Sequence, residues 1–471
     1  MNITVRDLLR TDGTVDRATY FAVGAAGMLV KFATDNLVAH LIFHREWRLF
    51  FYWFPLGYAA HFPELQRTSA DLRFLFTMAA VAVPFVWVGT TMTLRRLRDA
   101  GWAGWMVIFF FLPFVNILFF AVLCITESRA AARTREAQNP PTADTLLGAL
   151  IPRGAGGSAG VACLVTTALG LLAVPFSSKV LDTYGWGLFI AAPFSLGLIA
   201  TVLYGYHEPR TMRSCLYVAT LATIMVGVAL LLIAIEGLFC LVMALPLALP
   251  LAWMGAVIGY SIQTRRWNAR QAPAMLGIIL LAVPGMMTLE AAQREAPPLF
   301  AVRTAIEINA PPEQVWKQVV SFSQIAEPPE WIFQSGIAYP QRAEIFGSGP
   351  GAVRHCVFST GPFVEPITVW DEPRLLRFNV TQTPPPMHEL SPYGEIAPPH
   401  MQGYMLSKQG EFLLEALPGH RTRLTGTTWY QHGLWPAPYW RLWSDLLIHR
   451  IHLRVLRHIK NEAELQKAPA P

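Results

Sequence analysis

Three polar residues near the C-terminus have the types and spacing of a chemical site. Asp445, His449 and His452 stand at i, i+4 and i+7, so a helix would present all three on one face. One carboxylate and two imidazoles can ligate zinc or ferrous iron, or act as a general base with its orienting partner. In the structural alternative, Asp445 caps the helix or pairs with His449, and His452 packs against strands. We favour that alternative and assign no metal and no cofactor.

Large apolar side chains nearby could instead bind an apolar molecule. Four aromatic residues cluster where the same helix should begin, and such rings serve as pocket wall, core or interfacial anchor. The Pro-rich stretch 381–400 is long enough to act as a lid. The expected ligand-binding residues are Trp435, Tyr439, Trp440, Trp443, Ile448, His452, Met387 and Tyr393.

Two groups of charged residues lie in or beside apolar stretches of the N-terminal half. Lys31 and Asp35 are one helical turn apart, which suits either a proton or ion relay or a structural ion pair, the interpretation that we favour. Arg95, Arg96 and Arg98 follow a long apolar stretch and could bind lipid headgroups or fix the membrane topology.

Two further charged features have two interpretations each. Glu236 precedes Gly237 between two very apolar stretches, where we expect a tight interfacial turn; a buried functional carboxylate is the alternative. Arg450, Arg454 and Arg457 form a basic stripe on the last helix, which suits a solvated face, pairing with acids of the sheet, or contact with membrane phosphates.

The elements that carry these residues fall into two classes. Segments of about 20 apolar residues, the length that crosses a bilayer, fill the first 290 residues. The shorter aromatic segment 49–58 should lie at the membrane interface. The expected spans are 19–42, 74–94, 103–125, 158–176, 186–206, 214–235, 238–260 and 274–290.

After residue 298 the pattern changes to alternating strands. Apolar and polar residues alternate with a period of two between turn residues, and no later run is long enough to span. A short helix at 311–322 follows the first strand, and a long helix at 438–465 closes the chain. The expected strands are 301–309, 336–346, 351–359, 365–372, 374–382, 404–417 and 420–432.

Composition also indicates a membrane protein. The chain is 53% hydrophobic and only 14% charged, whereas a soluble domain usually carries about 25% charged residues. The net charge of +6 belongs to residues 1–298, since residues 299–471 contain 15 basic and 15 acidic residues. Basic charge there sets topology and is weak support for nucleic-acid binding. The five cysteines form no disulfide framework.

Three phrases of the C-terminal part resemble a known superfamily. They are VRTAIEINAPPEQVWKQVVSF (302–322), GSGPGAVRHCVF (347–358) and VWDEPRLLRFNV (369–380). They are similar to the START-like (SRPBCC) superfamily, which includes polyketide cyclases, dehydrases and lipid-transport proteins. The resemblance implies an α+β helix-grip domain, with a curved antiparallel sheet around a long C-terminal helix and an apolar cavity. Because the fold serves carriers, receptors and enzymes, it does not select one function.

The N-terminal quarter resembles a bacterial inner-membrane family of unknown function. The similar segments are GTVDRATYF (13–21) and RRLRDAGWAGW (95–105), the latter an Arg-Arg-Leu-His-Asp-like signature. Thr14 stands where arginine is usual, and Arg98 where histidine is usual. The resemblance implies membrane location and no particular activity.

We therefore expect a multi-pass inner-membrane protein whose START-like domain binds a hydrophobic or amphipathic ligand, such as a lipid or lipid precursor. One alternative is a cavity enzyme, cyclase-like or hydrolase-like, that uses Asp445, His449 and His452; another is a regulatory or scaffold protein. The expected partners are the bilayer and a small apolar molecule, not nucleic acid. The free cysteines and the habit of the superfamily favour a cytoplasmic domain. The expected division is 1–125 and 158–290 for the membrane part, with 126–157 as a polar connection, 291–298 as linker, 299–465 as the START-like domain and 466–471 as a tail.

Overall fold

The computed structural model of the chain contains two units that are interleaved in sequence. One unit comprises Met1–Ala229 and Ala244–Arg294, and the other comprises Leu230–Met243 and Glu295–Pro471. The short segment Leu230–Met243 therefore belongs with the C-terminal residues. The described residues are 8–45, 47, 52, 69–111, 116, 119–120, 123–124, 126, 128, 130, 146–264, 272–293, 296–392, 396, 398–401 and 403–465.

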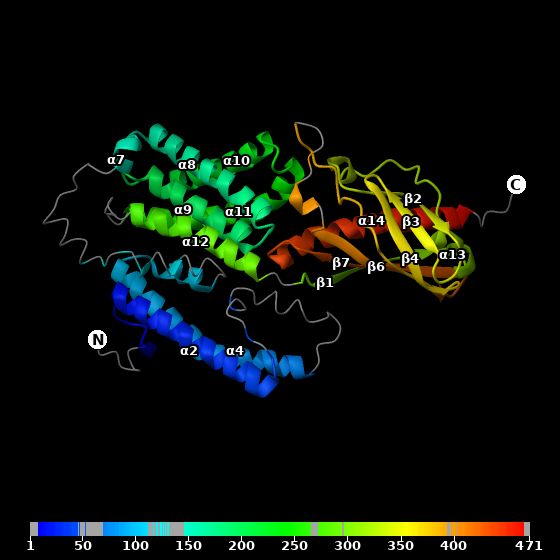
Figure 1. Cartoon of the computed structure of the whole chain (residues 1–471), viewed down its shortest axis with the longest axis horizontal. Helices are drawn as coiled ribbons and strands as arrows, with labels where there is room; N and C mark the ends of the chain where they lie inside the picture. Colours follow the sequence, from blue (N-terminus) through cyan, green and yellow to red (C-terminus); the bar gives the residue numbers. More distant parts are fainter. Residues whose placement is uncertain are drawn as a thin grey trace. The chain divides into compact units, whose positions relative to one another are not determined.

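Long apolar helices form the N-terminal unit (Figure 1). Within the described residues, seven helical stretches are long and apolar enough to cross a membrane, which confirms the expected multi-span architecture. Prolines inside the sixth of them are tolerated because neighbouring helices can satisfy the freed carbonyl groups. The helices are α2 (Arg17–Phe43), α4 (Ser69–Ala100), α7 (Leu146–Leu150), α8 (Ala155–Pro175) with its π-helical extension η3 (Phe176–Val180), η4 (Gly187–Ala191) with α9 (Ala192–Tyr204), α10 (Met212–Leu232), α11 (Leu238–Thr264) and α12 (Ala272–Ala292).

Two expected membrane segments fall largely outside the described residues. The predicted span 103–125 begins as a 3-10 helix, η2 (Gly104–Phe111), and much of its remainder is not described. Of the predicted interfacial segment 49–58, only Tyr52 is described. Both predictions stay untested beyond these residues.

Glycines bring the backbones of α9 and α11 into direct contact. A Cβ atom at Gly197 would lie 2.0 Å from the carbonyl oxygen of Ala252, and one at Gly255 would lie 2.0 Å from that of Phe194. Apolar helices in a bilayer gain little from hydrophobic burial against each other, so small residues that allow close packing stabilise their association. Packing therefore requires glycine at both positions.

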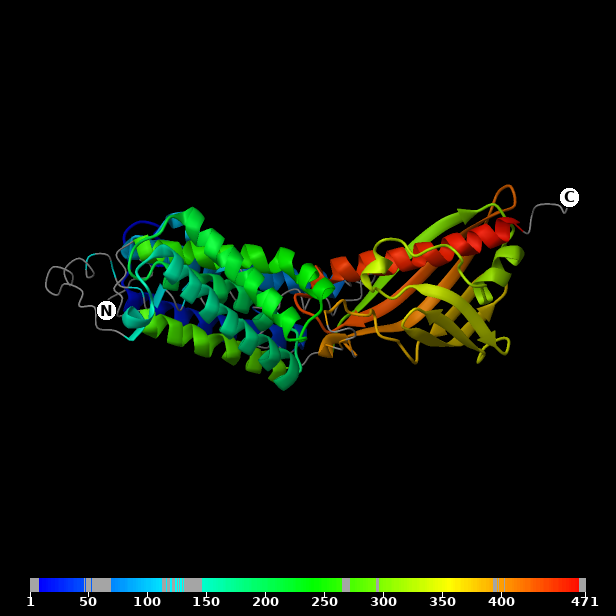
Figure 2. The same cartoon turned by 90° about the horizontal axis from the view of Figure 1, so that it is seen from above.

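Seven antiparallel strands form one sheet in the C-terminal unit (Figure 2). Their order is β1-β7-β6-β5-β4-β3-β2, so the first and last strands are neighbours, with Leu299 opposite Gln431. All seven predicted strands are present. They are β1 (Leu299–Ile308), β2 (Pro340–Phe346), β3 (Val353–Phe358), β4 (Gly361–Asp371), β5 (Leu375–Asn379), β6 (Met405–Leu417) and β7 (Arg421–His432).

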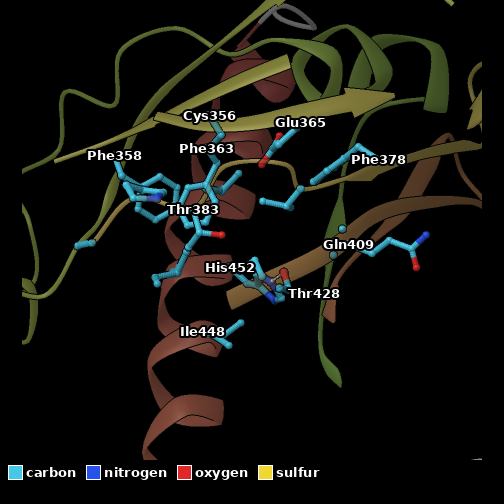
Figure 3. Close-up of a pocket in the computed structure, with 18 of the residues that line it drawn as sticks. Cys356, Phe358, Phe363, Glu365, Phe378, Thr383, Gln409, Thr428, Ile448 and His452 are labelled. Atoms are coloured by element: carbon cyan, nitrogen blue, oxygen red, sulfur yellow. Dashed lines mark hydrogen bonds between the residues drawn. The ribbon is translucent and has the colours of Figure 1, made fainter. Parts of the chain in front are cut away.

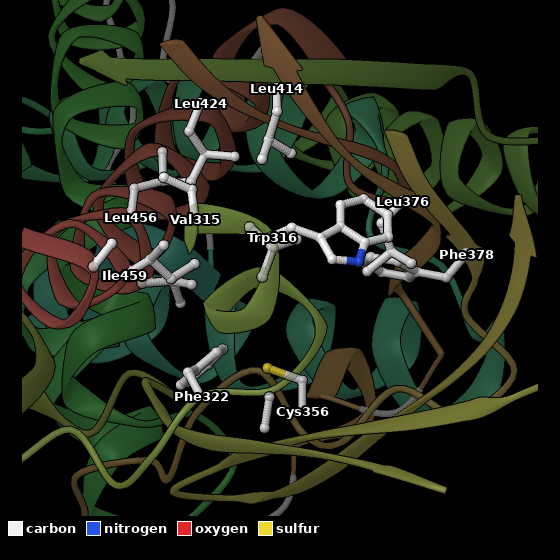
Figure 4. Packing of buried hydrophobic residues seen from close by; sticks show 14 of the residues in the cluster. Val315, Trp316, Phe322, Cys356, Leu376, Phe378, Leu414, Leu424, Leu456 and Ile459 are labelled. Carbon is white, nitrogen blue, oxygen red and sulfur yellow. The ribbon is translucent and has the colours of Figure 1, made fainter. Parts of the chain in front are cut away.

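Two helices, α13 (Pro312–Val320) and α14 (Ala437–Leu465), pack against this sheet. Trp316 of α13 is 2% exposed and lies at the centre of the core between strand and helix side chains (Figure 4). Successive side chains of a strand point to opposite faces of the sheet, so every second residue of a strand faces this core. A curved antiparallel sheet with a long C-terminal helix is the expected helix-grip fold, which is thereby confirmed. The other labelled core residues are Val315, Phe322, Cys356, Leu376, Phe378, Leu414, Leu424, Leu456 and Ile459.

The basic stripe of α14 is not one uniform surface. Arg450 and Arg457 are exposed, but Arg454 is only 4% exposed. Its guanidinium donates to the carbonyl of Glu327 at 2.7 Å and pairs with Glu330 at 3.2 Å. Arg454 thus fixes the loop before the 3-10 turn η5 (Phe333–Ser335) onto α14, and only its neighbours face solvent.

Candidate functional site

A cavity of about 150 Å³ lies between the sheet and α14 (Figure 3). Side chains of β3 and β4, such as Cys356 and Glu365, face Ile448 and His452 of α14 across it. The Pro-rich segment 383–386 also contributes to the wall. Most of the lining is apolar, and it includes Phe358, Phe363, Phe378, Val380, Met405, Phe412, Leu447, Ile451, Val455 and Leu456.

A buried ion pair provides the strongest polar feature of the cavity wall. Arg354 of β3 and Glu365 of β4 are opposite each other in the strand register and are 1% and 6% exposed. Nη1 of Arg354 donates to Glu365. Nε donates to the backbone carbonyl of Val320 at 3.3 Å. Nη2 has no hydrogen-bond partner among the described residues and is itself buried in the wall.

Aromatic rings surround the Arg354 guanidinium. Its central carbon lies 5.6 Å from the ring centres of Phe322, Phe378 and Phe412. A guanidinium at this distance from ring faces is attracted by their quadrupoles. The rings therefore hold the charged group in place without filling all of its hydrogen-bonding capacity.

Burial changes the pKa of two acidic groups, one within this pair and one beside it. It raises the pKa of Glu365 above its ordinary value of 4.5, and Arg354 opposes that effect. Burial also raises the pKa of the Cys356 thiol to about 12. A thiol with such a pKa is protonated at neutral pH and is a poor nucleophile. Cys356 therefore contributes packing and not covalent chemistry.

His452 is the one member of the predicted catalytic set that lines the cavity. Its Nε2 atom lies 2.8 Å from the hydroxyl of Thr428, and its Nδ1 atom lies 3.1 Å from that of Thr304. The same Thr304 hydroxyl is 2.8 Å from Nδ1 of His449. Burial lowers the pKa of His452 to about 4, so its ring is neutral at pH 7.

Asp445 is held by other partners. It accepts hydrogen bonds from Tyr430 at 2.6 Å and from Arg441 at 3.0 Å. Neither Asp445 nor His449 is among the described residues of the cavity wall. The two histidines thus share the Thr304 hydroxyl, Asp445 is bound by Tyr430 and Arg441, and catalysis by the three together stays a prediction.

The expected ligand-binding residues are distributed over several places. Ile448 and His452 line the cavity. Trp440 is 5% exposed, and its indole nitrogen donates to the carbonyl of Trp435 at 3.3 Å. Trp435 packs beside the buried cluster of Phe300, Val302, Tyr430, Ala437 and Ile448.

Of the four other expected residues, three are described, and these three lie away from the cavity wall. Tyr439 donates to the backbone carbonyl of Met243, and Trp443 is half-buried. Met387 is 6% exposed in a separate apolar cluster, and Tyr393 lies outside the described residues. Among the described residues, Tyr439, Trp443, Met387 and the two tryptophans above do not line the cavity. Their role in ligand binding stays a prediction.

The predicted pair within the membrane is formed. Lys31 and Asp35 of α2 make an ion pair, and Asp35 is fully buried. The Tyr52 hydroxyl also donates to Asp35, and the Lys31 ammonium lies 5.1 Å from the Tyr52 ring centre. Oδ1 of Asp35 has no hydrogen-bond partner among the described residues, so the pair is only partly satisfied, and its structural or relay role stays a prediction.

The three arginines in the last two turns of α4, Arg95, Arg96 and Arg98, differ in their surroundings. Arg96 is fully buried, donates to the carbonyl of Leu123 at 3.0 Å and pairs with Asp99. Arg95 and Arg98 donate to backbone carbonyls of the segment before α2. Arg96 therefore joins backbone segments, and only the other two could also contact lipid headgroups.

Arg354 and Glu365 were not expected from the sequence. The strand period of two could have revealed Arg354. It is two residues from the buried Cys356, so both side chains lie on the same face of the strand. A charged residue on the inner face of a strand is rare unless it is paired.

Comparisons with known proteins agree with both resemblances. Residues 300–397 match the family described as "Polyketide cyclase / dehydrase and lipid transport". Residues 8–134 match a family described as "Protein of unknown function (DUF805)". Both family assignments made from the sequence are confirmed. No curated protein matches the chain.

Solved structures with similarity to the C-terminal part include two enzymes of small-molecule metabolism. Norcoclaurine synthase from Thalictrum flavum shares 10% identity, and the match covers 37% of this chain and all of that one, with a TM-score of 0.25. The Zhui aromatase/cyclase from Streptomyces sp. R1128 shares 18% identity over 36% of this chain and 97% of that one, with a TM-score of 0.25. A third protein, TTHA0849 from Thermus thermophilus, shares 14% identity over 36% of this chain and 100% of that one, with a TM-score of 0.21.

Proposed function

Since the chain joins membrane-spanning helices to a helix-grip domain of the START-like superfamily, we propose that it binds an amphipathic small molecule from the bilayer. The observation that carries the proposal is the cavity, whose wall combines apolar side chains with one buried polar pair, Arg354 and Glu365. Pockets that bind small molecules commonly have this composition, with few polar groups that fix the orientation of an apolar ligand.

The size of the cavity limits what it holds in this state. A void of about 150 Å³ with an apolar lining accommodates a group of roughly benzene size. Burial of about six carbons at about 0.8 kcal/mol each would contribute about 5 kcal/mol, from which the loss of ligand freedom must be subtracted. Apolar contact alone thus gives weak binding, and a polar contact or a widened cavity is needed for more.

The charge of the wall favours a neutral acceptor on the ligand. Arg354 is already paired with Glu365, so the pair carries no net charge toward a third group. A buried anion beside it would lack full compensation. A neutral carbonyl or hydroxyl oxygen beside the pair would avoid that penalty. We therefore infer an aromatic or short aliphatic ligand group with a neutral oxygen at one end.

Filling the cavity tests the proposal. A Cβ atom at Gly426 would lie 3.6 Å from Phe412 and 3.8 Å from Leu456, both of which line the cavity. Gly426→Leu should therefore occupy the ligand space, and Gly426→Ala should leave most of it. We expect the full chain purified in detergent to retain an apolar compound, identified by native mass spectrometry, that Gly426→Leu loses and Gly426→Ala keeps.

Bulk membrane lipids retained by the spanning helices supply an internal reference for that experiment. They should be present equally in all three proteins. If the wild type retains nothing beyond this reference, or if Gly426→Leu retains the same compound at the same ratio while remaining folded by circular dichroism, the cavity is not the binding site.

A further inference from the structure

A second group of chemically active side chains lies away from the cavity, within the C-terminal unit. The Sγ atom of Cys240, a carboxylate oxygen of Glu389 and a ring nitrogen of His400 all lie within 4.8 Å of one another. Cys240 comes from the segment Leu230–Met243, whereas Glu389 and His400 come from the Pro-rich stretch 381–400. None of the three lines the ligand cavity among the described residues.

Two of the three separations resemble those of ligands around one metal ion, and the third, 2.5 Å between Sγ of Cys240 and Oε1 of Glu389, is a hydrogen-bond contact that must lengthen when the ion binds. Sγ of Cys240 is 3.1 Å from Nε2 of His400, and Nε2 is 3.8 Å from Oε1 of Glu389. Ligands at the usual zinc–sulfur and zinc–nitrogen distances in a tetrahedron are about 3.5 Å apart. A thiolate, an imidazole and a carboxylate are together a zinc ligand set. We propose that Cys240, Glu389 and His400 bind one Zn²⁺ ion.

A second carboxylate is placed to orient the histidine. Oε2 of Glu236 lies 3.4 Å from Nδ1 of His400, on the side of the ring away from Cys240. Histidines that bind zinc through one nitrogen usually donate from the other to a carboxylate, which fixes the ring and its tautomer. Glu236 is thus a positioning residue for His400.

The backbone around Cys240 is fitted to Glu389. A Cβ atom at Gly237 would lie 1.8 Å from Oε2 of Glu389, so only glycine leaves room for this carboxylate. The amide of Leu238 donates to the carbonyl of Leu390 at 2.9 Å, which fixes the two segments together. Met387 and Met401 belong to the apolar cluster against which Cys240 packs. An apolar shell of this kind excludes water from a metal site.

Charge also favours a divalent cation. Glu389 is 4% exposed, and its Oε2 atom has no hydrogen-bond partner among the described residues. A buried carboxylate requires a compensating charge. Zn²⁺ with one thiolate and one carboxylate is neutral overall, and binding would release the thiol proton to solvent. The alternative is a hydrogen-bonded cluster in which the Cys240 thiol donates to Glu389.

Metal content of the full chain distinguishes these two arrangements. The protein, purified in detergent without a histidine tag, should hold about one zinc per chain by elemental mass spectrometry after dialysis. Cys240→Ala and His400→Ala should reduce the zinc content to background. The control is Cys163→Ala, which removes a buried cysteine of α8 and should leave the zinc content unchanged. Glu236→Gln should weaken zinc affinity about 10–100-fold without abolishing it.

A measurement on the unaltered protein avoids dependence on the folding of the variants. After removal of zinc by a chelator, Cys240 should react with N-ethylmaleimide, and restored zinc should protect it, as shown by peptide mass spectrometry. A wild type that binds no zinc above background after loading, a Cys240→Ala variant that binds zinc as tightly as Cys163→Ala, or equal alkylation of Cys240 with and without zinc would overturn the proposal.

Discussion

At the scale of single residues, we expect Arg354 to contribute both to the stability of the cavity wall and to the selectivity proposed for it. It is buried with one anionic partner, Glu365, and three aromatic rings. Removal of one member of a buried ion pair leaves an uncompensated charge, whereas replacement of both by apolar residues of similar volume is often neutral. The two kinds of substitution therefore separate the role of the charge from that of the shape.

We expect Arg354→Met to destabilise the C-terminal unit by about 3–5 kcal/mol, and Arg354→Met with Glu365→Leu to recover most of that loss. The single variant should also be sensitive to pH. Burial holds the folded pKa of Glu365 above 4.5, so folding favours its protonated form. The added instability should be small below about pH 4.5 and grow as pH rises toward the folded pKa.

Thermal unfolding in detergent between pH 5 and pH 8 measures both effects. The melting temperature of Arg354→Met should fall with rising pH relative to the double variant. Equal pH dependence of the two proteins would mean that Glu365 is solvated, and would remove the basis for a neutral, oriented ligand.

At the scale of elements, backbone contact between α9 and α11 should set the stability of the helical unit. We expect Gly255→Ala to lower the melting temperature, because its Cβ atom would overlap the carbonyl oxygen of Phe194. Gly227→Ala in α10 is the matched control, since no atom lies within 4 Å of its would-be Cβ atom. The control should be neutral or stabilising by about 0.5–1 kcal/mol, because alanine favours a helix over glycine.

If both substitutions change the melting temperature equally, the close helix contact does not contribute to stability. A loss confined to Gly255→Ala would identify the α9–α11 contact as a determinant of the helical unit.

The elements themselves were predictable, and the reason is their strong periodicity. Apolar runs of about 20 residues and strands with a period of two leave little ambiguity, so seven of the eight expected spans and all seven strands lie near their observed bounds, and the span at 103–125 stays untested. The tertiary neighbours were less accessible. Asp445, His449 and His452 share a helical face, yet Asp445 is bound by Tyr430 of β7, while the two histidines share Thr304 of β1.

The same limit applies to the clusters that were missed. Cys240 and His400 are 160 residues apart, and no spacing rule connects positions so distant. Glu236 was recognised as a carboxylate with two interpretations; it lies in a bend and is 7% exposed, and a functional role for it stays a prediction. Its partner could not be inferred without the fold.

At the scale of the whole molecule, the C-terminal unit should depend on a segment distant in sequence. Phe239 and Cys240 pack against the apolar cluster that contains Ile332, Phe333 and Met387. We expect a fragment of residues 295–471 to retain its sheet by circular dichroism but to melt at a lower temperature than the same unit in the full chain. It should also bind an apolar fluorescent dye more strongly, because this cluster would be uncovered.

Substitution of Met387 by serine in the fragment supplies the control, since it should reduce dye binding at that cluster. A fragment that melts at the same temperature as the unit within the full chain would show that Leu230–Met243 contributes nothing to its stability.

The interleaved organisation also dictates an order of assembly during synthesis. The ribosome completes Leu230–Met243 before it makes any strand of the sheet. β1 cannot form its hydrogen bonds to β7, with Leu299 opposite Gln431, until β7 has also been made. Domains otherwise tend to fold in sequence as the chain emerges. Here the turn between α10 and α11 is made together with the membrane helices and then waits for a partner translated much later. Translation that stops before β7 would therefore yield inserted helices beside an unfolded C-terminal region, a species that cellular proteases should recognise.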